Sequence, residues 1–223
     1  MSHAHLRKIK SAADLAAWRE RLRGKEPGAT SADRRQVLVC FGGSCLASGA
    51  REVRDASELT PELLRKAKAA GLHTAVETSG AAPEEAFAPL LTLVDLWLWD
   101  VKGLDAEKHF KHTKRQLAPI LANLRHVNDA LAAEPARKRS IVLRCPMIPG
   151  INDGAKEIEA IGRLADSLSA VIELHVEPYI PYGIDKAHRL GLKVYEAPQP
   201  PPEYGQQIAA KLARRTAKPV RLP

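Results

Sequence analysis

The 223-residue sequence predicts an α/β fold built on a parallel sheet. Apolar runs of strand length alternate with longer runs of helical periodicity, which is the pattern of right-handed β-α-β units. One run, VDLWLWDVKGLD at 94–105, is apolar on both faces and ends in an acid and a base, Asp100 and Lys102. Such a strand is typical of the centre of a parallel sheet covered by helices. Its carboxyl end lies where these sheets bind ligands.

The first 36 residues predict a helical extension and a linker. Residues 11–23 form one amphipathic helix that begins at Ser11, with an apolar stripe made of Leu15, Trp18 and Leu22. Proline and glycine in the segment 24–33 then interrupt regular structure. We therefore divide the chain into an extension and linker at 1–36 and an α/β unit at 37–223. The strand near residue 37 is predicted to be an edge, and the helix 11–23 is predicted to cover it.

The remaining elements follow from apolar periodicity and from residues typical of helix ends. Thr60 is predicted to cap a helix that stops at Gly71. Pro119 is predicted to break a long helical region, and Asp153 to cap the helix after it. The segment 180–202 is rich in proline and is predicted to be irregular. The predicted strands are 36–41, 73–77, 94–102, 140–145 and 171–177, and the predicted helices are 60–70, 83–93, 105–134, 154–168 and 203–216.

The composition excludes several classes of protein. The formal charge of +8 is spread over helical segments, which is more typical of solvated helix faces than of a nucleic-acid site. Aromatic residues make up 4% of the chain, so no platform for base stacking is expected. No apolar run reaches the roughly 18 residues of a membrane helix, and the N-terminus has no signal-peptide pattern. Three cysteines, an odd number, favour a reducing, cytoplasmic location.

Charged and polar residues gather where the predicted strands end. In a parallel sheet all these ends meet at one edge. Charges are rarely buried there unless they pair with each other or with a ligand. A zwitterionic ligand with one amine and one carboxylate would satisfy the set, and so would an internal network of ion pairs. The residues concerned are Glu77, Thr78, Asp100, Lys102, Arg144, Glu177 and Tyr179.

Four segments of the chain carry a resemblance to a known protein family. AGLHTAVETSG (70–80), VDLWLWDVKGLDAEKH (94–109), IVLRCPMIPGINDG (141–154) and VEPY (176–179) stand in the order and spacing of the glycyl-radical-enzyme activating enzymes. These enzymes, typified by pyruvate formate-lyase activating enzyme, belong to the radical SAM superfamily. The resemblance covers about 58–223. It implies an incomplete parallel (β/α) barrel of radical SAM type, with the first strand missing and a helical extension at the N-terminus.

The resemblance also implies a cofactor and a chemistry. Glu77-Thr78 match the ETxG strand end beside the S-adenosylmethionine (SAM) site and a cation position. Asp100 and Lys102 match a DxK pair that contacts SAM, and Arg144 matches the arginine near its methionyl group. Gly42-Gly43 match the glycines of a GGE motif that holds the SAM amine. In the family a [4Fe–4S] cluster cleaves SAM to a radical, which takes hydrogen from a glycine of the partner enzyme.

The chain departs from the family at the cluster. The family's CxxxCxxC loop is absent, because the three cysteines are Cys40, Cys45 and Cys145. Cys145 is predicted to be a small core residue. Ser44 replaces the carboxylate of the GGE motif, and Ile180 stands where the family has a histidine. The sequence therefore predicts a degenerate activating enzyme, or alternatively a non-catalytic scaffold that binds SAM or docks a glycyl-radical enzyme.

A second resemblance covers residues 1–56. It is to the start of the flavoprotein subunits of NADH dehydrogenases and hydrogenases, where a C-x4-C pair can belong to a [2Fe–2S] module. Cys40 and Cys45 have this spacing, but the second pair is missing and such a site needs four thiolates. An electron-transfer module acting with a redox-complex subunit is the third alternative. A metal site at His109 and His112 is also conceivable, but a solvated helix face is the favoured interpretation.

Overall fold

The computed structural model describes residues 36–41, 56–180 and 199–222, with side chains described from Thr60 onward. Six strands form one sheet in the order β1-β2-β3-β4-β5-β6, and every neighbouring pair is parallel. A parallel sheet in sequence order is what successive β-α-β units produce. The strands are β1 Gln36–Phe41, β2 His73–Thr78, β3 Leu96–Asp100, β4 Ser140–Met147, β5 Val171–Pro178 and β6 Val220–Arg221.

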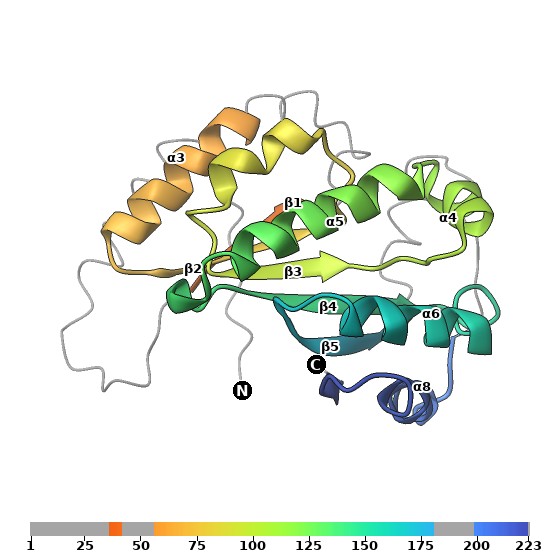
Figure 1. Cartoon of the computed structure of the whole chain (residues 1–223). Helices are drawn as coiled ribbons and strands as arrows, with labels where there is room; N and C mark the ends of the chain where they lie inside the picture. Colours follow the sequence, from red (N-terminus) through yellow and green to blue (C-terminus); the bar gives the residue numbers. More distant parts are fainter. Residues whose placement is uncertain (1–35, 42–55, 181–198, 223) are drawn as a thin grey trace, which may run out of the picture. The chain divides into compact units, whose positions relative to one another are not determined.

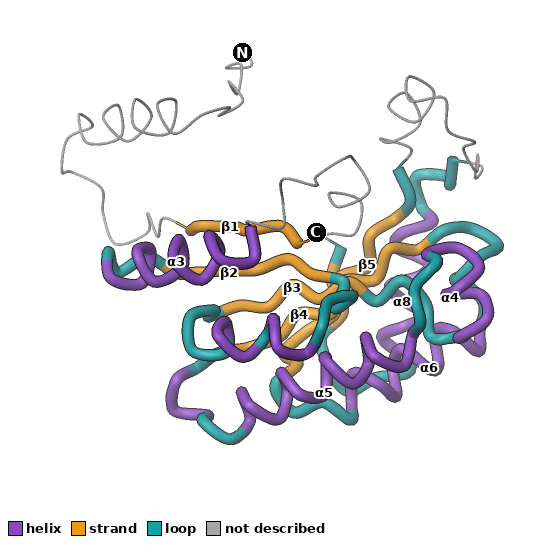
Figure 2. Tube along the Cα trace, turned by 90° about the horizontal axis from the view of Figure 1, so that it is seen from above, coloured by secondary structure: helices purple, strands orange, loops and turns teal. Residues whose placement is uncertain are grey.

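The helices of the described residues follow the strands along the chain. They are α3 Ala56–Ala69, α4 Ala106–Thr113, α5 Leu117–Ala132, α6 Ala155–Asp166 and α8 Tyr204–Ala213. Figures 1 and 2 show α3, α5 and α6 along the same face of the sheet. Helix α8 packs against α6 and shares its buried cluster, so it lies on this face too, and the described part of the chain packs no helix on the opposite face. The carboxyl ends of the strands and the helix α4 lie together at one end of the sheet (Figure 1).

The core lies between the sheet and these helices. Trp97 and Trp99 of β3 are fully buried, and Phe87 stacks on Trp99 with ring centroids 5.6 Å apart. Trp97, Trp99 and Val101 alternate along the strand and so share one face, and all three belong to one buried cluster. Helices were predicted to cover this strand, and in the described residues they cover the face that carries Trp97 and Trp99. The other face carries the charges at the strand ends, and a helix packed over it would bury them.

One predicted helix is replaced by shorter structure. The region predicted as the helix 83–93 forms two 3-10 turns, Glu84–Ala86 and Ala88–Leu90. Pro89 explains the interruption, because its ring has no N–H and clashes with the carbonyl group four residues earlier in a continuous helix.

The predicted helix 105–134 is broken at Lys114 rather than at Pro119. Lys114 has a φ of 58° and ends α4 in the left-handed conformation. Pro119 lies in the first turn of α5, where the N–H groups have no carbonyl partner within the helix, so a proline removes no helical hydrogen bond. Helix α3 begins at Ala56, so Thr60 lies inside it and is not its cap. Asp153 is not a cap either, because the N-cap of α6 is Gly154.

The two ends of the sheet are open among the described residues. β1 is at one end of the strand order, as predicted for an edge, and β6, which the sequence did not predict, is at the other. A row of parallel strands with helices on one face and charges on the other is consistent with an incomplete α/β barrel. The helix 11–23 lies outside the described residues, so its packing and the division at residue 36 stay predictions.

Within these same residues, no helix combines the length and the apolar character needed to cross a membrane.

Candidate functional site

Five charged side chains meet at the carboxyl ends of β2 to β5. We call this set the charged rim, and it consists of Glu77, Asp100, Lys102, Arg144 and Glu177. Arg144 is its centre, because its Nη1 lies 2.6 Å from Glu77 Oε1 and its Nε donates a hydrogen bond to Glu177. Lys102 Nζ donates to Asp100 Oδ2 at 2.9 Å. The structure thus brings together five of the residues that the sequence placed at this edge.

The strand register explains why these side chains meet. Asp100 on β3 pairs in register with Arg144 on β4, and residues in register on parallel strands point to the same face. Glu177 on β5 is two residues past His175, the register partner of Arg144, and therefore also shares that face. The rim is formed by the pleat of four consecutive strands, so its geometry depends on the sheet and not on a long loop.

The charges of the rim do not balance. Three carboxylates and two cations leave a formal charge of −1 when all five groups are ionised. Burial alone would lower the pKa of Arg144, but its close contacts with the carboxylates of Glu177 and Glu77 raise it. Arg144 therefore remains a fixed positive charge between two carboxylates.

Two polar atoms of the rim are buried without a hydrogen-bond partner. They are Asp100 Oδ1 and Arg144 Nη1. Nη1 is close to Glu77, but the contact is not aligned as a hydrogen bond, and Oδ1 lies 3.6 Å from Nη1. Leaving a buried donor or acceptor unpaired costs about 1–3 kcal/mol. A ligand carrying both an amine and a carboxylate would satisfy both atoms.

Thr78, which was also predicted at this edge, binds the backbone and not the charged side chains. Its hydroxyl accepts a hydrogen bond from the N–H of Gly80 at 3.0 Å. Gly80 has a φ of +73°, and a Cβ atom there would lie 2.2 Å from Trp99 Cζ2. The side chain of Asn123 donates to the carbonyl groups of Gly80 and Ala82 at 2.9 Å. The ETSG turn thus packs closely on the core, which fixes the end of β2 and with it Glu77.

The remaining predicted residues divide into three groups. Gly42, Gly43 and Cys45 lie outside the described residues. Cys40 pairs in register with Glu77 at the backbone level. Cys145 is fully buried in the core, as predicted, and burial raises the pKa of its thiol. A buried thiol of this kind is not available as a thiolate ligand.

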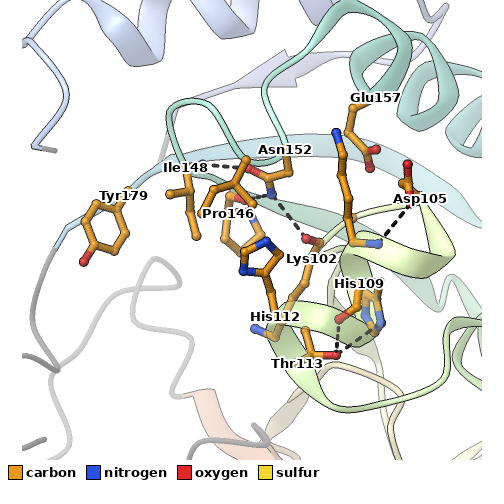
Figure 3. Close-up of a pocket in the computed structure, with 13 residues that line it drawn as sticks. Lys102, Asp105, His109, His112, Thr113, Pro146, Ile148, Asn152, Glu157 and Tyr179 are labelled. Carbon is orange, nitrogen blue, oxygen red and sulfur yellow. Dashed lines mark hydrogen bonds between the residues drawn. The ribbon is translucent and has the colours of Figure 1, made fainter. Parts of the chain in front are cut away.

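A cavity of about 330 Å³ adjoins the rim at Lys102 (Figure 3). Its walls come from the loop after β3, from α4 and from the ends of β4 and β5, and they include Tyr179. His112 and His109 line it, but His109 is only 5% exposed and its Nδ1 lies 3.0 Å from the carbonyl oxygen of Arg115. The predicted solvated helix face is therefore wrong for His109. No group of three or more metal-ligand side chains is present among the described residues.

Sequence reasoning missed two residues beside this cavity. Asn152 donates to the carbonyl of Lys102 (Figure 3), and Glu157 accepts from the N–H of Leu104 in the same loop. The only signal in the sequence was the PGIND segment after β4, where a polar residue follows a turn. A second polar cluster, in which Glu173 binds His175 and Arg221, lies on β5 and β6 and was also missed.

The amino-acid sequence is similar to those of several activating enzymes. It is 38% identical over 154 residues to the isethionate sulfite-lyase activating enzyme of Oleidesulfovibrio alaskensis. This alignment covers 69% of this chain and 44% of the relative. It is 29% identical over 157 residues to the pyruvate formate-lyase-activating enzyme of Staphylococcus epidermidis, at 68% and 59% coverage. The chain thus spans about half the length of these curated relatives. No protein-family model matches the chain.

Solved structures share the fold. A domain of pyruvate-formate lyase-activating enzyme from Bacteroides vulgatus superposes with a TM-score of 0.60 at 22% identity, covering 83% of this chain and 98% of that domain. Streptococcus suis SuiB bound to S-adenosylmethionine superposes with a TM-score of 0.52 at 8% identity, covering 73% and 36% of the two chains. The resemblance and the fold predicted from the four segments are therefore confirmed, whereas the resemblance of residues 1–56 stays a prediction.

Proposed function

We propose that this chain, a relative of the glycyl-radical-enzyme activating enzymes with a radical SAM fold, binds S-adenosylmethionine on the charged rim. The observation that carries the proposal is the pair of unsatisfied buried atoms, Asp100 Oδ1 and Arg144 Nη1, one an acceptor and one a donor. The methionyl end of SAM offers an ammonium group and a carboxylate. It can therefore satisfy both atoms at once.

The rim residues have distinct roles in this proposal. Asp100 accepts from the SAM amine, with Glu77 as a second carboxylate nearby. Arg144 and Lys102 bind the SAM carboxylate, and the planar guanidinium is well suited to a two-point contact. Glu177 holds the Nε of Arg144 and so orients its outer edge. SAM carries a net charge of +1 because of its sulfonium, which complements the formal charge of −1 on the rim.

Bound SAM supplies an activated sulfonium, whose carbon–sulfur bonds are weakened toward cleavage or transfer. The [4Fe–4S] cluster that cleaves SAM in the family does not fit the residues of this chain. The sequence has three cysteines without the CxxxCxxC spacing, and Cys145 is enclosed in the core. We therefore derive no reductive step from these residues, and the proposed function is SAM binding.

Kinship with activating enzymes supports a glycyl-radical enzyme as the partner. In this proposal the SAM-bound sheet presents a docking surface for that enzyme. The electron for SAM cleavage would come from a cluster that these residues do not hold. Such a non-catalytic scaffold is the second candidate function, and the absence of a complete thiolate set favours it. Cys40 and Cys45 remain candidates for an electron-transfer module.

Calorimetric titration of the full chain with SAM tests the proposal. The wild-type chain is expected to bind SAM, and Asp100→Asn is expected to weaken binding by about 1.5–3 kcal/mol, because a hydrogen bond to a charged group is lost. Asp95→Asn is the matched control, since Asp95 lies just before the same strand at its opposite end. Binding that is equal in wild type and Asp100→Asn would show that SAM does not use the rim.

A further inference from the structure

We propose that Asn152 and Glu157 are positioning residues that clamp the loop after β3 and thereby fix Lys102 at the charged rim. The effect on SAM binding rests on the proposed function, but the hydrogen bonds that hold the loop do not depend on SAM. The strand pairing of β3 ends just before Lys102, since the N–H of Val101 still donates to the carbonyl of Arg144 at 2.7 Å. Beyond Val101 the backbone groups of Lys102 and Leu104 are bound by side chains and not by a neighbouring strand.

Asn152 supplies the first of these contacts. Its Nδ2 donates to the carbonyl oxygen of Lys102 at 3.2 Å and to that of Pro146 at 2.7 Å, while its Oδ1 accepts from the N–H of Ile148 at 2.7 Å. The residue is only 6% exposed. One buried amide therefore joins the end of β3 to the end of β4 through three backbone groups (Figure 3). A side chain without both a donor and an acceptor cannot make this set.

Glu157 supplies the second contact, from the first turn of α6. Its Oε1 accepts a hydrogen bond from the N–H of Leu104, two residues beyond Lys102. Between the two clamped positions lies Gly103, whose φ of +149° is in the region that favours glycine. The loop is thus held on both sides of a conformation that it would not retain without support.

The clamp fixes the backbone position from which the Lys102 side chain extends. The lysine ammonium is a point charge on a flexible stem, so the region it can reach depends on where the backbone of the residue lies. The Lys102 side chain is 38% exposed, and its ammonium group pairs with the carboxylate of Asp100. Fixing the carbonyl of Lys102 keeps its ammonium beside the buried carboxylate. Without the clamp the ammonium would be distributed between the rim, the cavity and solvent.

A double-mutant cycle on the full chain tests whether Asn152 acts through Lys102. Asn152→Ala is expected to weaken SAM binding about tenfold in the wild-type background and less than about twofold in the Lys102→Met background. Asn128→Ala is the control, because Asn128 is also buried and its side-chain oxygen accepts from the N–H of Ala170 at 2.9 Å, at the end of β5 opposite the rim. It should lower the melting temperature without changing the affinity for SAM. Equal losses from Asn152→Ala in both backgrounds would overturn the positioning role.

Hydrogen exchange tests the clamp without SAM. The amide of Leu104 is expected to exchange about tenfold faster in Glu157→Ala than in wild type, and at nearly the wild-type rate in Glu157→Gln, which keeps the acceptor. Unchanged exchange in Glu157→Ala would overturn the Glu157 contact.

The two experiments separate the clamp from the proposed function. If the wild-type chain binds no SAM while Glu157→Ala frees the Leu104 amide, the proposed function fails and the clamp stands. If SAM binds but neither Asn152→Ala nor Glu157→Ala changes affinity or exchange, the clamp fails and SAM binding stands.

Discussion

Arg144 Nη1 on β4 lies 2.6 Å from Glu77 Oε1 on β2, although β3 runs between these two strands. The contact therefore spans β3, and Asp100 Oδ1 on that strand is 3.6 Å from the same nitrogen. One guanidinium therefore holds together charges from four strands when its contact with Glu177 on β5 is included. This arrangement links the stability of the sheet edge to its capacity to bind a ligand.

Arg144→Met is expected to lower the free energy of unfolding by about 2–3 kcal/mol, because three carboxylates then face each other without their central cation. Partial exposure of the side chain, at 20%, keeps the cost below that of a fully enclosed pair. Urea unfolding at neutral pH measures the change. Arg163→Met is the control, since Arg163 pairs with Glu159 on the surface of α6, and it should change stability by less than about 0.5 kcal/mol. Similar effects of the two substitutions would contradict a structural role for the rim.

Gly80→Ala is expected to destabilise the fold far more than Gly150→Ala. Both glycines have a φ near +73°, so both substitutions strain the backbone by about 1 kcal/mol. A Cβ atom at Gly80 also lies 2.2 Å from Trp99 Cζ2, while one at Gly150 meets nothing within 4 Å. The extra overpacking should cost about 1–3 kcal/mol. Chemical denaturation of both variants gives the difference, and equal losses would show that the turn does not press on the tryptophan.

Asp95 provides a prediction about pH. Its Oδ2 accepts from the N–H of Thr74 at 2.9 Å, and Lys68 lies 2.6 Å from Oδ1. Burial alone would raise the pKa of Asp95, but the hydrogen bonds from Lys68 and Thr74 lower it below its ordinary value of 3.8. A lowered pKa in the folded state means that the stabilisation is present above pH 3.8 and is lost as the pH falls through the lower value.

The measurement is the stability of wild type and Asp95→Asn between pH 7 and pH 2.5. At pH 7 the wild type should be more stable by about 1 kcal/mol. The difference should shrink only below about pH 4. A difference that disappears between pH 7 and pH 5 would mean that another group is responsible.

Iron content tests the interpretation of the cysteines. After anaerobic reconstitution the full chain is expected to hold much less than one iron atom per molecule, because three cysteines at these positions do not form the family's loop. Iron and sulfide assays with an electronic absorption spectrum give the answer. About four iron atoms per chain would contradict our view of the cluster, and about two would support the electron-transfer alternative at Cys40 and Cys45.

Much of the fold could be predicted because it depends on local patterns. The five long strands follow from apolar runs such as IVLRC and VIELHVE, and the edge charges follow from the rule that parallel strands end together. The interrupted helix at 83–93 was missed because its apolar residues keep helical spacing while Pro89 removes the hydrogen bond. The two-residue β6 has no pattern of its own and forms only by pairing with β5.

The rim could be predicted only as a set of residues. That Arg144 would bind Glu77 and Glu177 depends on the register of three strand pairs, which one sequence does not specify. The roles of Asn152 and Glu157 depend on hydrogen bonds to backbone groups about 50 residues away, and such contacts have no sequence signature.

The measurement that tests the central claim most directly is a comparison of SAM and S-adenosylhomocysteine by calorimetry on the wild-type chain and on Glu77→Gln. The two ligands differ in the sulfonium charge and its methyl group, so a rim with a formal charge of −1 should favour SAM by about 1 kcal/mol or more at low salt. Glu77→Gln makes the rim neutral and should reduce this preference, because its effect on the amine that both ligands share cancels in the comparison. Tighter binding of S-adenosylhomocysteine than of SAM, or a preference for SAM that Glu77→Gln leaves unchanged, would contradict the account.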